Sequence, residues 1–256
     1  MKSAKRAAGI DGQCVGAFAL NLEENLKQLQ LELQTKQYRA QPVKRVEIPK
    51  DDGGVRLLGI PAVRDRIVQQ VLLNILQPIF DIDFHPSSYG YRPKLSCHDA
   101  INKVTVFIRK HHLDWAVDMD LSKCFDLLDH ELIISSVKHK VTDSSILKLI
   151  HQFLKCVVMI GANWEASTVG SPKGGVISPL LANIYLDAFE QEMKKRTHRI
   201  VRHADDTLIL CRTEKAAQNA LVTATQILEK DWKLTVNQKK THIAHSGKGV
   251  KFWEWR

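Results

Sequence analysis

The spacing of apolar residues predicts a chain built largely from amphipathic helices. Leu22, Leu26, Leu29 and Leu33 recur at the interval that is typical of a helix with one apolar face. Similar stripes, together with Ser, Asp and Pro at favoured starting positions, predict further helices. The predicted helices are residues 22–38, one beginning at 61, 96–110, one beginning near 129, 144–158, one beginning at 178, and 214–231.

Short runs of β-branched and apolar residues predict strands between these helices. Residues 43–49 and 55–60 form two such runs, and the segment Lys50-Asp51-Asp52-Gly53-Gly54 between them is typical of a hairpin turn. Residues 115–121 have the composition of a buried strand, and residues 234–236 are also strand-like. The chain therefore mixes helices with several short strands.

Acidic residues gather where predicted strands end. Asp205 and Asp206 lie at the tip of a second predicted hairpin, and Asp120 lies near the end of a predicted buried strand, with Asp118 and Asp126 nearby. An Asp pair in a turn is most often ordinary turn chemistry, and Asp126 is also a candidate for a helix N-cap. A charge on a buried strand, by contrast, usually has a partner or a metal ion. Asp120 with Asp205 and Asp206 would suit two magnesium ions, as used in phosphoryl transfer to a hydroxyl.

Composition and charge narrow the class of protein. The 256 residues carry a net charge of +9, and basic residues recur along the whole chain, which favours a surface that follows a polyanion; a merely soluble basic protein is the alternative. The five cysteines form no Cys-x-x-Cys pair, which argues against a zinc site and a disulfide framework. No signal peptide and no apolar run of membrane-spanning length is present, so we expect a cytoplasmic protein without membrane association.

Basic and glycine-rich loops are candidates for contact with phosphates. Lys50 and Arg56 lie on the first predicted hairpin, where they would cover phosphates or serve only as solvated edge residues. The loop 87–93 carries two tyrosines and Arg92, which would stack on a nucleotide or simply anchor the loop. In the segment 170–175, glycines would let the backbone approach a ligand, or only make a turn.

Six blocks of sequence then establish a resemblance. They are Ile48-Pro49-Lys50 with residues 56–61 and 65–69; residues 88–93; Asp120-Leu121 with residues 125–126 and 129–130; residues 170–186; Ala204-Asp205-Asp206; and Asn237 with Lys240-Thr241. In these blocks, which together cover residues 9–245, the chain resembles a reverse transcriptase of the bacterial retroelement type, most like the protein encoded by group II introns. One block alone would be suggestive, but all six in the order of the family make chance agreement very rare.

The resemblance implies an α/β (α+β) fold with the fingers and palm of a right-hand polymerase, in which an antiparallel palm sheet packs on helices. It implies an N-terminal and fingers region over residues 1–112 and a palm over 113–256, with part of the fingers returning around 130–175. The whole would form a single reverse transcriptase domain over about 9–250. We expect a chain truncated to these parts, in which the thumb is absent.

The resemblance also implies chemistry: nucleotidyl transfer from a deoxynucleoside triphosphate to a DNA primer on an RNA template, with intron RNA as the expected template. Two Mg²⁺ ions would be held by Asp120, the backbone of Leu121, Asp205 and Asp206. Lys240 would donate a proton to pyrophosphate, although a solvated lysine is the alternative. The remaining implied contacts are Lys50, Arg56, Phe125 (as a gate against the ribose 2′-hydroxyl), Lys173 and Arg92 for the nucleotide, and His203, Gly174 and Pro172 for primer and template.

Three departures from the family pattern leave alternatives open. His203 stands where the family has Tyr, Lys173 where it has Gln, and Phe252-Trp253-Glu254 where it has Phe-Leu-Gly. These changes are compatible with an active polymerase, because the metal-binding acids are intact. They are also compatible with a catalytically impaired remnant that acts only in RNA binding, as a maturase-like scaffold. A stand-alone retron or phage-defence enzyme fits the blocks less well.

Overall fold

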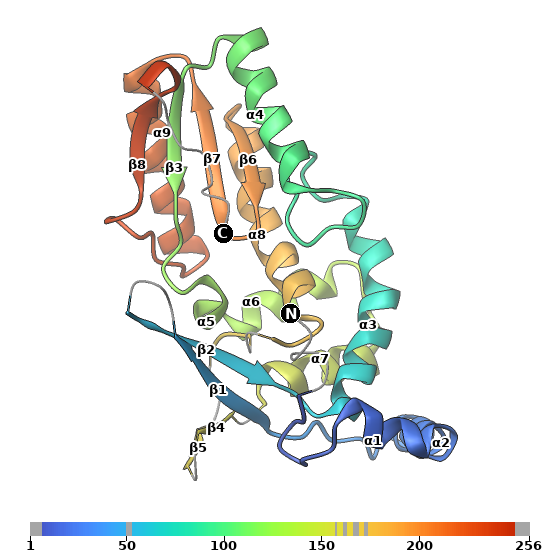
Figure 1. Ribbon diagram of the computed structural model, residues 1–256. Coiled ribbons are helices and arrows are strands. Elements are labelled where there is room, and N and C mark those ends of the chain that lie inside the picture. Colours follow the sequence, from blue (N-terminus) through green and yellow to red (C-terminus); the bar gives the residue numbers. More distant parts are fainter. Residues whose placement is uncertain are drawn as a thin grey trace. The chain divides into compact units, whose positions relative to one another are not determined.

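The computed structural model describes residues 7–49, 53–156, 158–160, 163–165, 169–171 and 174–248 (Figure 1). The side chain of Arg56 and those of residues 158–160, 163–165 and 248 are not among the described atoms. The chain divides into two compact units, each assembled from two separate segments. The first unit comprises Met1–Ile79 and His130–Ser178, and the second comprises Phe80–Asp129 and Pro179–Arg256.

The first unit combines helices with a small mixed sheet. Its elements are α1 (Val15–Leu20), α2 (Leu22–Gln34), β1 (Val43–Pro49), β2 (Val55–Ile60), α3 (Val63–Asp81), α6 (His130–Lys138), α7 (Ser144–Leu154), β4 (Val158–Ile160) and β5 (Asn163–Glu165). The strand order is β2-β1-β4-β5, in which β1 pairs antiparallel with β2 and parallel with β4. Buried Tyr38 joins these layers, because its ring lies 6.2 Å from that of Phe153 and its hydroxyl donates to Asp65 at 2.5 Å.

The second unit is built on an antiparallel sheet. Its elements are α4 (Cys97–His111), β3 (Trp115–Met119), α5 (Cys124–Leu127), α8 (Ser178–Lys195), β6 (Arg199–His203), β7 (Asp206–Cys211), α9 (Glu214–Gln226), a π-helix (Ile227–Asp231), β8 (His242–His245) and a 3₁₀ turn (Ser246–Lys248). The strand order is β6-β7-β3-β8, and every neighbouring pair is antiparallel (Figure 1).

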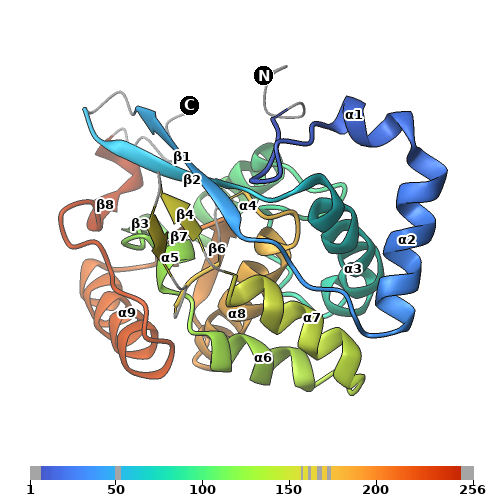
Figure 2. The same cartoon turned by 90° about the horizontal axis from the view of Figure 1, so that it is seen from below.

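The two faces of this sheet have different partners. Side chains alternate along a strand, so Ala116 of β3 and Leu208 and Leu210 of β7 share one face, where they form a buried core with α4. The opposite face packs against α9, as the two views agree (Figures 1 and 2). By the same alternation Asp118 and Asp206 belong to the α4 face. The sheet therefore carries both acids at the same end of this face.

The predicted fold class is confirmed, and so are the two predicted hairpins and most helices. Some boundaries were wrong. The helix predicted to run to Tyr38 ends at Gln34, and the helix predicted to run to Val158 ends at Leu154, because Val158 pairs with β1. Residues 234–236 form only an isolated bridge, and the edge strand is instead β8, which follows the basic turn.

Two further expectations concern the cysteines and membrane-spanning helices. All five cysteines lie in the described part and are free thiols. Among the described helices, none is both long enough and apolar enough to cross a lipid bilayer.

Candidate active site

The β6–β7 hairpin places Asp205 and Asp206 at the end of the sheet. The register pairs His203 with Asp206, so only Ala204 and Asp205 form the turn. Ala204 has φ of 60°, in the left-handed region that non-glycine residues rarely occupy. Such a conformation persists only where the surroundings enforce it. The turn therefore requires support from outside the hairpin.

That support is the buried side chain of Arg202, which is fully inaccessible to solvent. Its Nη1 donates to the carbonyl oxygen of Ala204 at 2.7 Å and to Oδ1 of Asn183 at 2.9 Å. Its Nη2 donates at 2.7 Å to both Oγ of Ser88 and Oε2 of Glu190, which is also fully buried. One guanidinium thus ties the acidic turn to α8 and to the loop before α4.

The loop before α4 also packs directly on the turn. Tyr89 donates its N–H to the carbonyl of Arg202, and Arg202 donates its own to the carbonyl of Ser87, both at 2.9 Å, so this loop extends the sheet beyond β6. A Cβ added to Gly90 would lie 2.1 Å from the backbone nitrogen of Ala204, a distance that no real side chain tolerates. Glycine is required here because two backbone segments touch.

The acids at the ends of β3 and β7 lie close enough to raise one another's pKa. Burial raises the pKa of Asp206 to about 6, and the negative charges of Asp205, Asp120 and Asp118 add to the shift. Burial likewise raises the pKa of Asp118. His242, its partner on β8, lowers this pKa, and Asp120 raises it. A cation bound here would stabilise the ionised form of these carboxylates.

The turn between Val236 and β8 positions Asp120. Nδ2 of Asn237 donates to Oδ2 of Asp120 at 2.8 Å, and Nζ of Lys240 lies 3.7 Å from Oδ1. The backbone of Asp120 is held too: its N–H donates to Oγ1 of Thr241, and its carbonyl accepts from the N–H of Asn237. Leu121 is buried and bridges Val236. The charges of four side chains in the second unit therefore influence one another: those of Asp120, Asp205, Asp206 and Lys240.

The donor set is compatible with magnesium. Carboxylate oxygens are its preferred ligands, and a cation would offset the charges of Asp205, Asp120 and Asp118, which add to the effect of burial on the pKa of Asp206. Within the described residues, no three acidic, histidine or cysteine side chains are placed to hold a metal ion by themselves. Magnesium usually completes its shell with water and substrate phosphates, so a partial protein shell is sufficient.

Other predicted residues of the second unit have varied surroundings. The half-buried ring of Phe125 meets the ring of Tyr91 edge-on at 6.3 Å. Burial lowers the pKa of His203, and the charge of Arg202 lowers it further. Arg92 is largely buried, and its guanidinium pairs with Asp81 at 2.8 Å and donates to three backbone carbonyls. These contacts give Arg92 a structural role, and its contact with a nucleotide stays a prediction.

In the first unit, Gly174 has φ of 108°, and an added Cβ would lie 2.2 Å from the carbonyl oxygen of Gly59. The next residues are fixed by the buried Gln69, whose Oε1 accepts from the N–H of Val176 at 2.7 Å and from that of Ile177. The glycine-rich segment is thus built against β2 and α3. The predicted residues Lys50, Pro172 and Lys173, the side chain of Arg56 and the segment Phe252-Trp253-Glu254 lie outside the described residues.

The supporting residues Arg202, Glu190, Asn183 and Gly90 were not predicted as part of the site. Arg202 adjoins the acidic turn in sequence, but its partners do not, so no local pattern marks them. An Arg placed in a run of β-branched residues was the one available signal, because a charge in a buried strand requires a partner.

Comparison with known proteins agrees with this geometry. The sequence profile of the family described as reverse transcriptase (RNA-dependent DNA polymerase) matches residues 48–253. The chain belongs to the reverse transcriptase family. The match spans both units and includes the acidic turn, Asp120 and the turn that positions it.

Relatives extend the comparison. Protein YkfC of Escherichia coli K12 is 33% identical, over 95% of this chain and 74% of that protein. The group II intron-encoded protein LtrA of Lactococcus lactis is 35% identical over 69% of this chain, and the putative COX1/OXI3 intron 2 protein of Saccharomyces cerevisiae is 33% identical over 67%. This reverse transcriptase chain spans only 30% and 20% of those two intron proteins.

Solved structures show the same fold. Telomerase from Candida tropicalis, solved with a fragment of telomeric RNA, superposes with a TM-score of 0.63 at 16% identity, over 88% of this chain and 45% of that one. Apo telomerase from the same organism gives 0.60 at 14% identity, over 88% of this chain and 49% of that one. At this identity the likeness concerns the fold, which is that of polymerase fingers and palm.

Proposed function

We propose that this protein is an RNA-directed DNA polymerase of the group II intron type. Its substrates are deoxynucleoside triphosphates, a DNA primer and an RNA template, with intron RNA as the proposed template. The first unit serves as the fingers and the second as the palm. The observation that carries the proposal is the coupling of Asp206 to Asp205 and Asp120 in a member of the reverse transcriptase family.

In this proposal Asp120, Asp205, Asp206 and the carbonyl of Leu121 hold two magnesium ions. Magnesium at this site would neutralise triphosphate charge and favour ionisation of the primer hydroxyl. Asn237 orients the Asp120 carboxylate and Thr241 holds the backbone N–H of Asp120, while the Arg202 contact keeps the turn with Asp205 and Asp206 in one backbone conformation. The protein's own contribution is therefore to hold these acids in place before substrate arrives.

The chemical step is a displacement at phosphorus. The primer 3′-oxygen forms a bond to the α-phosphorus of the triphosphate, the bond to the pyrophosphate oxygen breaks, and the hydroxyl proton leaves to solvent. Lys240, whose Nζ lies near the Asp120 carboxylate, donates a proton to the departing pyrophosphate. Lys50 and Arg56 of the β1–β2 hairpin bind the triphosphate.

The remaining assignments concern selection and positioning. Phe125, held edge-on by Tyr91, excludes a ribose 2′-hydroxyl. His203 supports the primer end, and Pro172, Lys173 and Gly174 contact the template and nucleotide. Arg92 acts on this path through the loop that it fixes, since its guanidinium is bound to Asp81.

Primer extension tests the proposal. Purified protein is incubated with an RNA template, a DNA primer, deoxynucleotides and magnesium, beside Asp206→Asn and the control Asp231→Asn, which makes the same change at an exposed position. We expect extension by the wild type and the control, and a loss of about 10²-fold or more in Asp206→Asn. A folded wild type that binds RNA yet extends no primer over a range of salt would refute the polymerase and leave an RNA-binding protein. Binding alone does not decide, because phosphate contacts make it salt-dependent in either case.

A further inference from the structure

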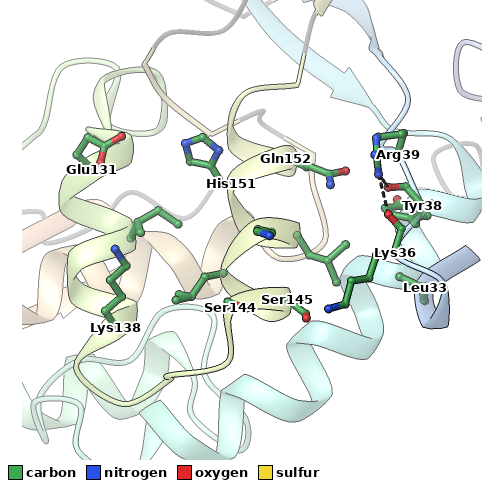
Figure 3. Close-up of a pocket in the computed structure, with 14 residues that line it drawn as sticks. Leu33, Lys36, Tyr38, Arg39, Glu131, Lys138, Ser144, Ser145, His151 and Gln152 are labelled. Atoms are coloured by element: carbon green, nitrogen blue, oxygen red, sulfur yellow. Dashed lines mark hydrogen bonds between the residues drawn. The ribbon is translucent and has the colours of Figure 1, made fainter.

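The first unit contains a pocket of about 630 Å³ that the proposed reaction does not use. It is bounded by the end of α2 with the turn that follows, by α6, and by α7 (Figure 3). Its volume is in the range of sites that bind small organic groups. All of its lining residues belong to the first unit, so the pocket is complete within one compact body.

The charged residues that line this pocket are mostly basic. Lys36, Arg39, Lys138 and Lys148 line it, against a single carboxylate, Glu131. Within the described part of the chain, none of the three lysines forms an ion pair or a hydrogen bond through its ammonium group, and all three are exposed. Lys36 also acts on the carboxylate of Asp143, the N-cap of α7, but the basic groups around the pocket outnumber the carboxylates and so attract an anion.

The basic side chains do not all lie on one side of the pocket. In Figure 3, Lys138 of α6 and Lys36 lie on opposite sides, and Ser144 and Ser145 lie between them. Arg39 is oriented by its own Nη1, which donates to the carbonyls of Lys36 at 3.0 Å and Tyr38 at 2.8 Å. Basic groups on different sides of one pocket suit the successive phosphates of a strand.

Apolar side chains also line the pocket. They are Leu33, Ile134, Leu147 and Leu149, of which Ile134 is buried. Burial lowers the pKa of His151 and Lys155 lowers it further, which disfavours a positive charge on this ring. The ligand that fits is therefore anionic along its length and apolar between its charges, as a polynucleotide with its sugars and bases is.

We propose that this pocket binds single-stranded RNA, with phosphates on Lys36, Lys138 and Lys148 and a sugar and base over the leucines. The inference rests on the proposed function, which supplies the RNA strand, and it assigns to α2, α6 and α7 an RNA contact separate from the catalytic acids. An acidic peptide would also satisfy the lysines, and it is distinguished in the test.

The test compares two triple variants that lose the same charge. Lys36→Ala/Lys138→Ala/Lys148→Ala removes the pocket lysines, and Lys110→Ala/Lys215→Ala/Lys230→Ala removes three exposed lysines of the second unit. Fluorescence anisotropy with a labelled 20-nucleotide RNA measures Kd over a range of salt, after circular dichroism has shown that each variant is folded. Each lost phosphate contact on a single strand lowers the salt slope by about 0.7, so we expect the pocket variant to lose about 2 from the slope. Its affinity should fall roughly tenfold or more at 0.1 M salt, and the control should keep both.

Other outcomes overturn the inference. If both variants lose equal affinity and slope, the pocket lysines act only through net charge. If the pocket variant keeps its RNA affinity but loses binding of a labelled glutamate-rich peptide, the ligand is an acidic protein. Primer extension at saturating template separates this test from the polymerase test. A wild type that extends no primer refutes the polymerase proposal only. A pocket variant with unchanged RNA binding refutes the pocket inference only.

Discussion

Replacing Arg202 by methionine removes the contact on which the acidic turn depends while keeping an unbranched side chain of similar length. The change leaves Glu190 buried without its cation, at zero solvent exposure, and leaves the carbonyl of Ala204 without a donor. Burial already raises the pKa of Glu190, so without Arg202 the carboxyl takes up a proton instead of staying charged. The turn then loses its link to α8.

The magnitude follows from what is broken. Removing one partner of a buried ion pair costs about 3–5 kcal/mol of unfolding free energy, because the remaining carboxyl is left desolvated without its cation and must take up a proton to stay buried. Arg202→Met should lie in that range, since the pair is 2.7 Å apart and fully buried. In the double variant Arg202→Met/Glu190→Met no charge remains, so its loss should be smaller than the sum of the single losses by about 2–3 kcal/mol.

Urea unfolding measures these values by tryptophan fluorescence, with Trp164 of the first unit replaced by phenylalanine in every protein compared, so that Trp115 and Trp232 of the second unit contribute to the signal. Primer extension is measured at a temperature at which each variant is folded, and we expect the turn's loss of support to lower it in both the single and the double variant. A loss below about 1 kcal/mol in Arg202→Met, or additive losses in the double variant, would refute the reasoning.

Three further predictions use the same assays. Gly90→Ala should lose about 1–3 kcal/mol and most primer extension because its Cβ has no space. Gly16→Ala, whose Cβ meets only the sulfur of Cys14 at an ordinary contact distance of 3.9 Å, should lose neither stability nor extension. Burial lowers the pKa of His85 to about 4, so the unfolded state alone takes up the proton as pH falls from 6.5 to 4 and stability is lost in that window. His85→Asn should abolish this loss and His139→Asn, at an exposed position, should keep it; equal pH profiles in all three proteins would contradict the assignment. Asn237→Ala should raise the magnesium concentration for half-maximal extension without changing RNA affinity, and an unchanged magnesium dependence would contradict its positioning role.

Local patterns predicted the elements that local chemistry determines. The β1–β2 hairpin has the predicted bounds, and the helix predicted over residues 96–110 is α4, which begins at Cys97 after the cap formed by Ser96. By contrast, Val158 stands in a continuous apolar run that suits a helix or a strand equally, and only pairing with Val43 makes it a strand. β8 has a weak apolar pattern and becomes a strand because β3 offers it an edge.

The candidate site was predictable in its acids and unpredictable in its support. Asp120, Asp205 and Asp206 stand in short recognisable blocks, and their mutual influence on pKa agrees with a common site. The partners that hold them come from distant segments: Asn183 lies on α8, and Asn237 lies in a turn after the π-helix. Such contacts depend on tertiary packing, which no window of sequence contains.

The position of β3 in the middle of its sheet has a consequence for synthesis. Both neighbours of β3 come late in the chain, since β7 begins at Asp206 and β8 at His242. During translation the strand Trp115–Met119 has therefore left the ribosome long before either partner exists, and its backbone groups stay unpaired meanwhile. Folding must close long loops to complete the sheet, which slows it and exposes an apolar strand to aggregation. We expect the newly made chain to depend on chaperones until residue 245 has been added.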